Sequence, residues 1–188
     1  MKTQQITTSN LLLRQWQDSD YDAFARLNAD ANNMRFFPAP LAREESDHLA
    51  NRCRDLINQR GWGFWAVEEV LSGQFIGCVG LHAPDYQLPV SPCVEVGWRL
   101  LPEFQGKGYA TEAAQAALGF GFNELHLDEI IAFTTLTNLP SQAVMRRLGM
   151  QRDFNNDFDH PLLDPQHPLV RHCLYRLSQQ DWFNLKNS

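Results

Sequence analysis

Residues 94–109 read VEVGWRLLPEFQGKGY, and they run directly into ATEAA at positions 110–114. The stretch begins as an alternating apolar run, passes through a loop with two glycines, and then takes on the spacing of an amphipathic helix. This order predicts a strand, a loop and the first turn of a helix. A helix start presents free backbone N–H groups and the positive end of the helix dipole, and glycine lets an anion approach the backbone closely. The loop from Gln105 to Ala110, with the positive charge of Lys107, is therefore predicted to bind a phosphate group.

Spacing separates this loop from two common phosphate-binding loops. A dinucleotide-binding G-x-G-x-x-G needs a third glycine, and none follows Gly108 at the required distance. A Walker A loop has two glycines five residues apart with a lysine directly after the second, and Lys107 is not placed in that way. On the two glycines alone, a plain strand–helix connection stays open as the alternative.

The same periodicity arguments extend an α/β pattern over the rest of the chain. Strands are predicted at residues 11–14, 63–70, 75–81, 93–100, 129–135 and 169–177. Helices are predicted near residues 21–28, 43–60, 110–125 and 140–148, with a short terminal one from Ser178 onward. Irregular loops are predicted at residues 32–40, 83–92 and 155–168. No linker-like segment or internal repeat divides the sequence, which predicts a single α/β domain over residues 1–188.

The composition argues against several classes of function. A net charge of −6 over 188 residues is unfavourable for direct nucleic-acid binding. The four cysteines form no C-x-x-C pair and the six histidines show no ligand spacing, so no metal site is predicted. The N-terminal residues lack an apolar signal core, and no apolar stretch is long enough to span a bilayer. We therefore expect a cytoplasmic protein that does not contact membranes.

The phosphate-loop motif continues into its surroundings. Gln105, Gly108 and Ala110 match the pattern Q/R-x-x-G-x-G/A in order. Further matches are the flanking VEVGWRL and ATEAA, the LLLR of residues 11–14, Asn138 with Ser141, and the RRLGM of residues 146–150. Over roughly residues 11–154 these features resemble the GCN5-related N-acetyltransferase (GNAT) superfamily. The similarity is closest to the branch of ribosomal-protein N-terminal alanine and serine acetyltransferases.

The resemblance implies the GNAT fold, which is a central, twisted, mostly antiparallel sheet that is splayed at the acetyl-coenzyme A site and has helices on both faces. It also implies which residues bind the coenzyme. They are Trp98, Arg99 and Leu100 along the pantetheine arm, Gln105, Gly106, Lys107, Gly108, Tyr109 and Ala110 around the pyrophosphate, and Asn138 and Ser141 near the pantetheine amide and the sulfur. Asn138 can also be a helix N-cap, and the two roles are compatible.

The implied activity is transfer of an acetyl group from acetyl-coenzyme A (acetyl-CoA) to a primary amine, by direct attack in a ternary complex and without a metal. The branch suggests a protein or peptide N-terminal α-amine as the acceptor. Two alternatives stay open, namely an acetyltransferase of a small amine such as a polyamine or an aminoglycoside, and a non-catalytic module that binds acyl-CoA. The family also suggests a homodimer.

Candidate catalytic residues come from the same alignment. Many family members place a tyrosine on the helix after the asparagine to donate to the departing sulfur, but this chain has Met145 there. By similarity to the ribosomal-protein branch, Ser141 is the expected donor. Glu95 on the central strand is the first candidate for the general base, and His82 is the second. A water relay, or an amine that arrives already deprotonated, remains an alternative.

Two of the predicted loops are expected to form the acceptor side. Phe36 and Phe37 in the first loop are candidates for an acceptor-binding surface, although loop aromatics also cap cores. Asp157, Asp159 and Asp164 make the second loop acidic. Such a loop attracts a cationic acceptor, and a solvated loop explains the same residues equally well.

Overall fold

A computed structural model of the chain describes residues 4–186. The strands are β1 (Ile6–Thr7), β2 (Leu11–Arg14), β3 (Phe64–Glu69), β4 (Gln74–His82), β5 (Glu95–Leu100), β6 (Glu129–Thr135), β7 (Gln151–Asp159) and β8 (Arg171–Ser178). The helices are α1 (Tyr21–Ala29), α2 (Arg43–Arg60), α3 (Tyr109–Asn123), α4 (Leu139–Arg147) and α5 (Gln179–Lys186), with short 3-10 turns η1 (Asp18–Asp20) and η2 (Pro102–Phe104). Internal contacts divide these elements into two units, and β4, β5 and α3 contribute residues to both. The first unit holds the chain up to Leu81 with Gly97–Ala117, and the second holds His82–Val96 with the chain from Leu118 onward.

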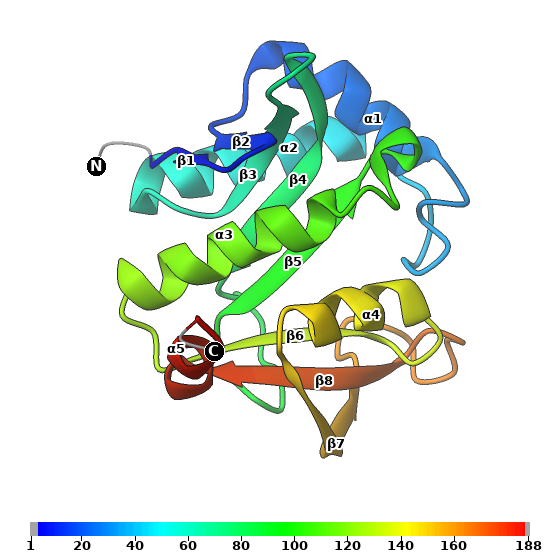
Figure 1. Ribbon diagram of the computed structural model, residues 1–188. Coiled ribbons are helices and arrows are strands. Elements are labelled where there is room, and N and C mark those ends of the chain that lie inside the picture. Colours follow the sequence, from blue (N-terminus) through cyan, green and yellow to red (C-terminus); the bar gives the residue numbers. More distant parts are fainter. Residues whose placement is uncertain (1–3, 187–188) are drawn as a thin grey trace. The chain divides into compact units, whose positions relative to one another are not determined.

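The first unit is built around the antiparallel strands β1 to β4, which pair in the order of the sequence. Leu13 on β2 lies opposite Val67 on β3, and both side chains are fully buried. Phe24 of α1 and Ile57 of α2 are buried with them, so both helices contribute to this core. Figure 1 shows α2 behind β3 and β4, and the start of α3 in front of these strands. The unit is therefore a sheet with helices on both faces.

β3 and β4 approach each other closely at Gly80. A Cβ atom added there would lie 1.9 Å from the carbonyl oxygen of Gly63 and 2.8 Å from the Cα of Phe64. Both neighbours are backbone atoms, and the Gly63 carbonyl already accepts a hydrogen bond from the Leu81 N–H at 3.1 Å. The backbone cannot move aside without disturbing the ladder, so Gly80 is required by this close approach.

The second unit contains the start of β5 and the strands β6, β8 and β7. β5 runs parallel to β6, with Glu95 opposite Ile131, whereas β8 pairs antiparallel with both β6 and β7. Leu88, Phe158 and Leu174 pack with Ile131 in a common core. α4 packs against β6 and α5 against β8 (Figure 1). Across the two units the strand order is β1-β2-β3-β4-β5-β6-β8-β7, which confirms the predicted mixed, mostly antiparallel sheet.

Most of the predicted elements are confirmed, and the helix at residues 43–60 and the strand at residues 129–135 agree at both ends. The irregular loop predicted at residues 155–168 is wrong in its first part, where the chain continues β7 to Asp159. β7 is polar, so it carries little strand signal, and its pairing with β8 includes a register shift between Asp153 and Phe158. Ion pairs between Arg152 and Asp157 and between Arg176 and Asp153 accompany this irregular strand.

Two further expectations concern the chain as a whole. β1 was not predicted, because two residues are too short for a periodic signal. The single domain expected over residues 1–188 stays a prediction. In residues 4–186, no helix has both the length and the apolar character that crossing a bilayer requires.

Gly80→Ala is expected to lower the free energy of unfolding by about 1–3 kcal/mol, because the new methyl group overlaps paired backbone. Urea unfolding followed by circular dichroism measures this change. Gly119→Ala is the matched control. Gly119 lies within α3, and a Cβ there would meet the Trp182 side chain of α5 at 3.5 Å, which is an ordinary van der Waals contact. The control should stabilise the protein by about 0.5–1 kcal/mol. Equal stability of Gly80→Ala and the wild type would contradict the close-approach argument.

Candidate active site

The predicted phosphate loop joins β5 to α3 in the first unit. Gly106 and Gly108 have positive φ angles of 74° and 87°, conformations that side chains other than glycine rarely adopt. A Cβ atom at either position would meet no other atom within 4 Å. The loop is exposed and its concave backbone is open.

Backbone N–H groups in this loop lack protein acceptors. The first helical hydrogen bond of α3 runs from the Glu112 N–H to the Gly108 carbonyl at 3.0 Å. Among the described residues, no acceptor is found for the N–H groups of the five positions 106–110. A run of free donors at the start of a 15-residue helix is a site for an anion. The pyrophosphate of a nucleotide-containing substrate such as acetyl-CoA fits this arrangement.

Side chains of the predicted coenzyme-binding set hold the loop in place. Gln105 Nε2 donates to the Leu100 carbonyl at 2.9 Å and to Asn33 Oδ1 at 2.7 Å. The Tyr109 hydroxyl donates to Glu69 Oε1 at 2.7 Å. Gln105 and Tyr109 therefore anchor the loop to the rest of the first unit. Their partners Asn33 and Glu69 were not predicted, because both lie far from the loop in sequence.

Glu112 in the first turn of α3 has a structural role. Its carboxylate accepts hydrogen bonds from the Thr8 hydroxyl at 2.6 Å and from the Asn10 N–H and side chain, both at 2.9 Å. Burial opposes ionisation, but these hydrogen bonds outweigh it and lower the pKa of Glu112. The carboxylate thus joins the start of β2 to the start of α3.

Three predicted pantetheine-lining residues end β5. Leu100 is buried, and Trp98 and Arg99 are partly buried. The Arg99 Nη1 group donates to Asn28 Oδ1 on α1. Its guanidinium carbon lies 4.1 Å from the centre of the Phe37 ring.

Phe36 and Phe37 face different partners within the first unit. Phe37 stacks on Arg99, whereas Phe36 lies under the Arg35 guanidinium carbon, which is 4.5 Å from its ring centre. Both rings are partly buried. Of the two, only Phe37 contacts another predicted site residue, Arg99.

In the second unit, Asn138 and Ser141 form the start of α4. Asn138 is the N-cap, because its Oδ1 accepts from the Ser141 N–H at 3.2 Å, and its Nδ2 donates to Thr134 Oγ1 at 2.9 Å. The hydroxyl of Ser141 is partly exposed and has no partner among the described residues. Met145, at the tyrosine position of many relatives by motif, is only 2% exposed. Ser141 is therefore the available hydroxyl donor at this helix start.

Glu95 and His82 are also in the second unit. Glu95 begins β5 and keeps some solvent exposure, yet burial raises its pKa to about 8. No ion pair or hydrogen bond to a described residue offsets this effect. His82 ends β4 and is partly exposed. Burial thus moves the pKa of Glu95 into the range that suits a general base.

The aspartates of the predicted acidic loop are engaged by neighbouring groups. Asp157 pairs with Arg152, and Asp159 pairs with Arg171 at 3.2 Å. The Arg152 guanidinium lowers the pKa of Asp157 through a hydrogen bond. Asp164 Oδ1 accepts from the Gln166 N–H at 2.7 Å. The charges of Asp157 and Asp159 are thus balanced by arginines, whereas Asp164 accepts only a backbone hydrogen bond.

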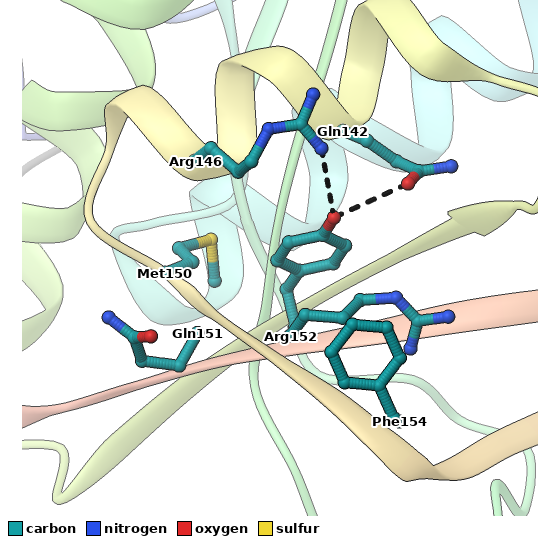
Figure 2. A pocket seen from close by; sticks show the side chains of 7 residues that line it. Gln142, Arg146, Met150, Gln151, Arg152 and Phe154 are labelled. Carbon is teal, nitrogen blue, oxygen red and sulfur yellow. Dashed lines mark hydrogen bonds between the residues drawn. The ribbon is translucent and has the colours of Figure 1, made fainter.

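A hollow of about 420 Å³ lies beside α4 in the second unit (Figure 2). The Tyr175 hydroxyl donates to Gln142 Oε1 and accepts from Arg146 Nη1, both at 3.3 Å. Its lining residues are Gln142, Arg146, Met150, Gln151, Arg152, Phe154 and Tyr175. None of the predicted site residues lines it. In residues 4–186, no cluster of three or more His, Cys, Asp or Glu side chains is placed to hold a metal ion.

Comparison with known proteins assigns the family. The acetyltransferase (GNAT) domain model matches residues 10–151. The N-acetyltransferase YnaD of Bacillus subtilis strain 168, itself uncharacterized, is 34% identical over 149 residues, covering 79% of this chain and 83% of YnaD. The FsC-acetyl coenzyme A-N(2)-transacetylase of Aspergillus fumigatus is 32% identical over 132 residues, covering 67% of this chain and 54% of the relative.

Solved structures agree with the family assignment. A GNAT-family acetyltransferase from Bacillus anthracis superposes with a TM-score of 0.77 at 25% identity, covering 94% of this chain and 99% of that one. The exposed N–H groups at the start of α3 therefore occur in a domain whose family uses acetyl-CoA. The chain belongs to the GNAT family of acetyl-CoA-dependent N-acyltransferases.

Proposed function

We propose that this GNAT enzyme acetylates the α-amine of a peptide or protein N-terminus. The observation that carries the coenzyme half of the proposal is the run of free N–H donors at positions 106–110. They would hold the pyrophosphate of acetyl-CoA, with the backbone of Trp98, Arg99 and Leu100 along its pantetheine arm and Asn138 near the amide. Gln105 and Tyr109 would contribute by fixing the loop.

The acceptor half of the proposal rests on two features. Ser141 stands where the ribosomal-protein branch has its sulfur-directed serine, and its hydroxyl is uncommitted. The ion pairs of Asp157 and Asp159 remove charge that would favour a polycationic amine. A peptide α-amine needs no such acidic surface.

The proposed chemistry is a direct transfer. The neutral amine attacks the thioester carbonyl carbon, a C–N bond forms, and the C–S bond breaks. A backbone N–H near Leu100 would stabilise the oxyanion. Ser141 would donate a hydrogen bond to the departing thiolate, and Glu95 would accept the proton that leaves the amine, with His82 as the second candidate.

The first test is release of free coenzyme A thiol from acetyl-CoA. Peptides with N-terminal Ser or Ala should support release, whereas polyamines and aminoglycosides should not. Gly108→Val should abolish acetyl-CoA binding in calorimetry, because the valine side chain would fill the open concavity.

Gly73→Val is the matched control for this test. Gly73 has a φ of 67° and equally open space, but it lies in the turn between β3 and β4. Gly73→Val should share the backbone strain and keep acetyl-CoA binding. Release with only a small amine would replace the proposed acceptor, and tight binding of acetyl-CoA without release to any acceptor would favour a non-catalytic binder.

Ser141→Ala should lower kcat by about 10- to 100-fold, the effect of one hydrogen bond to a charged group. The Kd for acetyl-CoA should change little, because the Asn138 cap uses the Ser141 backbone rather than its hydroxyl. Ser141→Thr keeps the hydroxyl and should recover most of the activity. Unchanged kcat in Ser141→Ala would exclude the donor role.

Glu95→Gln should change the pH dependence of stability and of rate. Because the folded pKa of Glu95 is raised to about 8 from 4.5, the folded state holds more protons than the unfolded state between these values. The free energy of unfolding therefore falls as pH rises through this window, and the variant should gain stability relative to wild type from about pH 5 to 8. In wild type, kcat/KM should increase with pH and level off above an apparent pKa of about 8. This increase should be smaller in the variant.

Glu112→Gln is the control for both measurements. Because the pKa of Glu112 is lowered in the folded state, its contribution to stability depends on pH only below the unfolded pKa of 4.5. The difference in stability between Glu112→Gln and wild type should therefore stay constant from pH 5 to 8. If Glu95→Gln follows the wild-type rate profile but shows the stability change, Glu95 is a buried acid without a catalytic role.

A further inference from the structure

The Arg99 side chain on β5 is packed among residues of the first unit. The residue is partly exposed, yet the protein around it is dense enough that burial lowers the pKa of the guanidinium. Asn28 of α1 accepts one hydrogen bond from it, and the Phe37 ring covers one face at 4.1 Å. This combination describes a cation set deep in the unit but still reached by solvent.

No anion among the described residues balances Arg99. The nearby thiols of Cys53 and Cys78 have pKa values raised by burial to about 12 and about 11, so both are neutral. No carboxylate of a described residue pairs with the guanidinium. A buried cation that lacks a counter-charge is costly, and folds avoid it unless another need is met.

Arg14 in the same unit shows how this chain treats a structural buried arginine. It pairs with Asp20 at 2.8 Å and with Glu68 at 2.7 Å, and the Arg14 and Asp20 side chains are 5% and 2% exposed. Hydrogen bonding to Asp20 is the largest effect and raises the pKa of Arg14. Arg99 has no such carboxylate partner among the described residues, so the stability of the fold does not account for its position.

Arg99 also has donors left over. Only its Nη1 group makes a hydrogen bond to a described residue. Arg60 Nη2 is the one buried side-chain nitrogen or oxygen in the described part that lacks a partner, so the remaining Arg99 N–H groups are not sealed from solvent. A planar guanidinium with N–H donors left over matches the geometry of a carboxylate.

We propose that Arg99, held by Asn28 and Phe37, binds a carboxylate of the acceptor, so that preferred acceptors carry a carboxylate close to the accepting amine. The inference rests on the proposed function, because it names the acceptor class of the same reaction. It also gives Phe37 a role, since the ring fixes the plane of the guanidinium that meets the carboxylate.

The test compares acceptors that differ only in that carboxylate. The first pair is Ala-Asp-Gly and Ala-Asn-Gly, both with amidated C-termini, which differ in the side-chain carboxylate. The second pair is free alanine and alanine amide, which differ in the α-carboxylate. In wild type, the acid of at least one pair should exceed its amide in kcat/KM by about 10- to 100-fold. Arg99→Gln should bring that ratio to about 1, and Arg99→Lys, which keeps the charge but not the planar fork, should lie between them.

Arg26→Gln is the matched control, since Arg26 is an exposed arginine of the same unit that pairs with Glu103 at 3.1 Å. It should keep the wild-type ratio. If Arg99→Gln does not fold, the wild-type ratio of kcat/KM for acid over amide still tests the inference. Equal values for acid and amide in both pairs would overturn the inference. It is also overturned if Arg99→Gln keeps the acid preference and instead weakens acetyl-CoA binding, which would assign Arg99 to the coenzyme.

Calorimetric titration of each acceptor in the presence of coenzyme A separates this inference from the proposed function. Tighter binding of the acids, lost in Arg99→Gln, supports the carboxylate site even if no acceptor is acetylated. Thiol release that is equally fast with acids and amides supports the enzyme and rejects the site.

Discussion

The backbone N–H groups of positions 106–110, which have no acceptor among the described residues, are the constraint around which the first unit is organised. Such groups are unfavourable in a folded chain unless water or an anion meets them, so the loop that carries them must be held from outside. Gln105 ties it to β5 and to Asn33, and Tyr109 ties it to Glu69. Glu112 fixes the following turn of α3 to the start of β2. The N–H groups of the loop stay accessible because the side chains of Gln105 and Tyr109 are hydrogen-bonded to groups outside the loop.

Buried charges divide this molecule into paired and unpaired groups. Arg14 is neutralised by two carboxylates and belongs to the framework of the first unit. Arg99 and Glu95 are only partly exposed and have no counter-charge among the described residues, and desolvation shifts the pKa of each toward its neutral form. The shifts are opposite in sign, and each group occurs in a part of β5 that the motif marks as functional. Unpaired buried charges are unfavourable for stability, which is why they are informative about function.

The sequence was sufficient where the deciding interactions are local. α2 was predicted at both ends because its apolar stripe lies within 20 residues, and the order of strand, glycine loop and helix around Gly106 and Gly108 was predicted because these residues are adjacent. β7 was missed because a polar strand is specified by its register with β8 rather than by its own pattern. The partners of Arg99 were missed for a related reason, since Asn28 lies 71 residues away in sequence. Periodicity does not report such contacts.

The start of α4 shows how one helix can serve structure and chemistry with different atoms. Asn138 satisfies the backbone N–H of Ser141 and is itself held by Thr134, so the first turn is fixed without the serine hydroxyl. One turn later, Met145 is turned into the core, where a tyrosine hydroxyl would need a partner. A buried methionine at this position packs in the core and offers no hydroxyl donor. The donor proposed instead, Ser141, lies in the first turn, where the Asn138 cap fixes the backbone and leaves the Ser141 oxygen without a partner among the described residues.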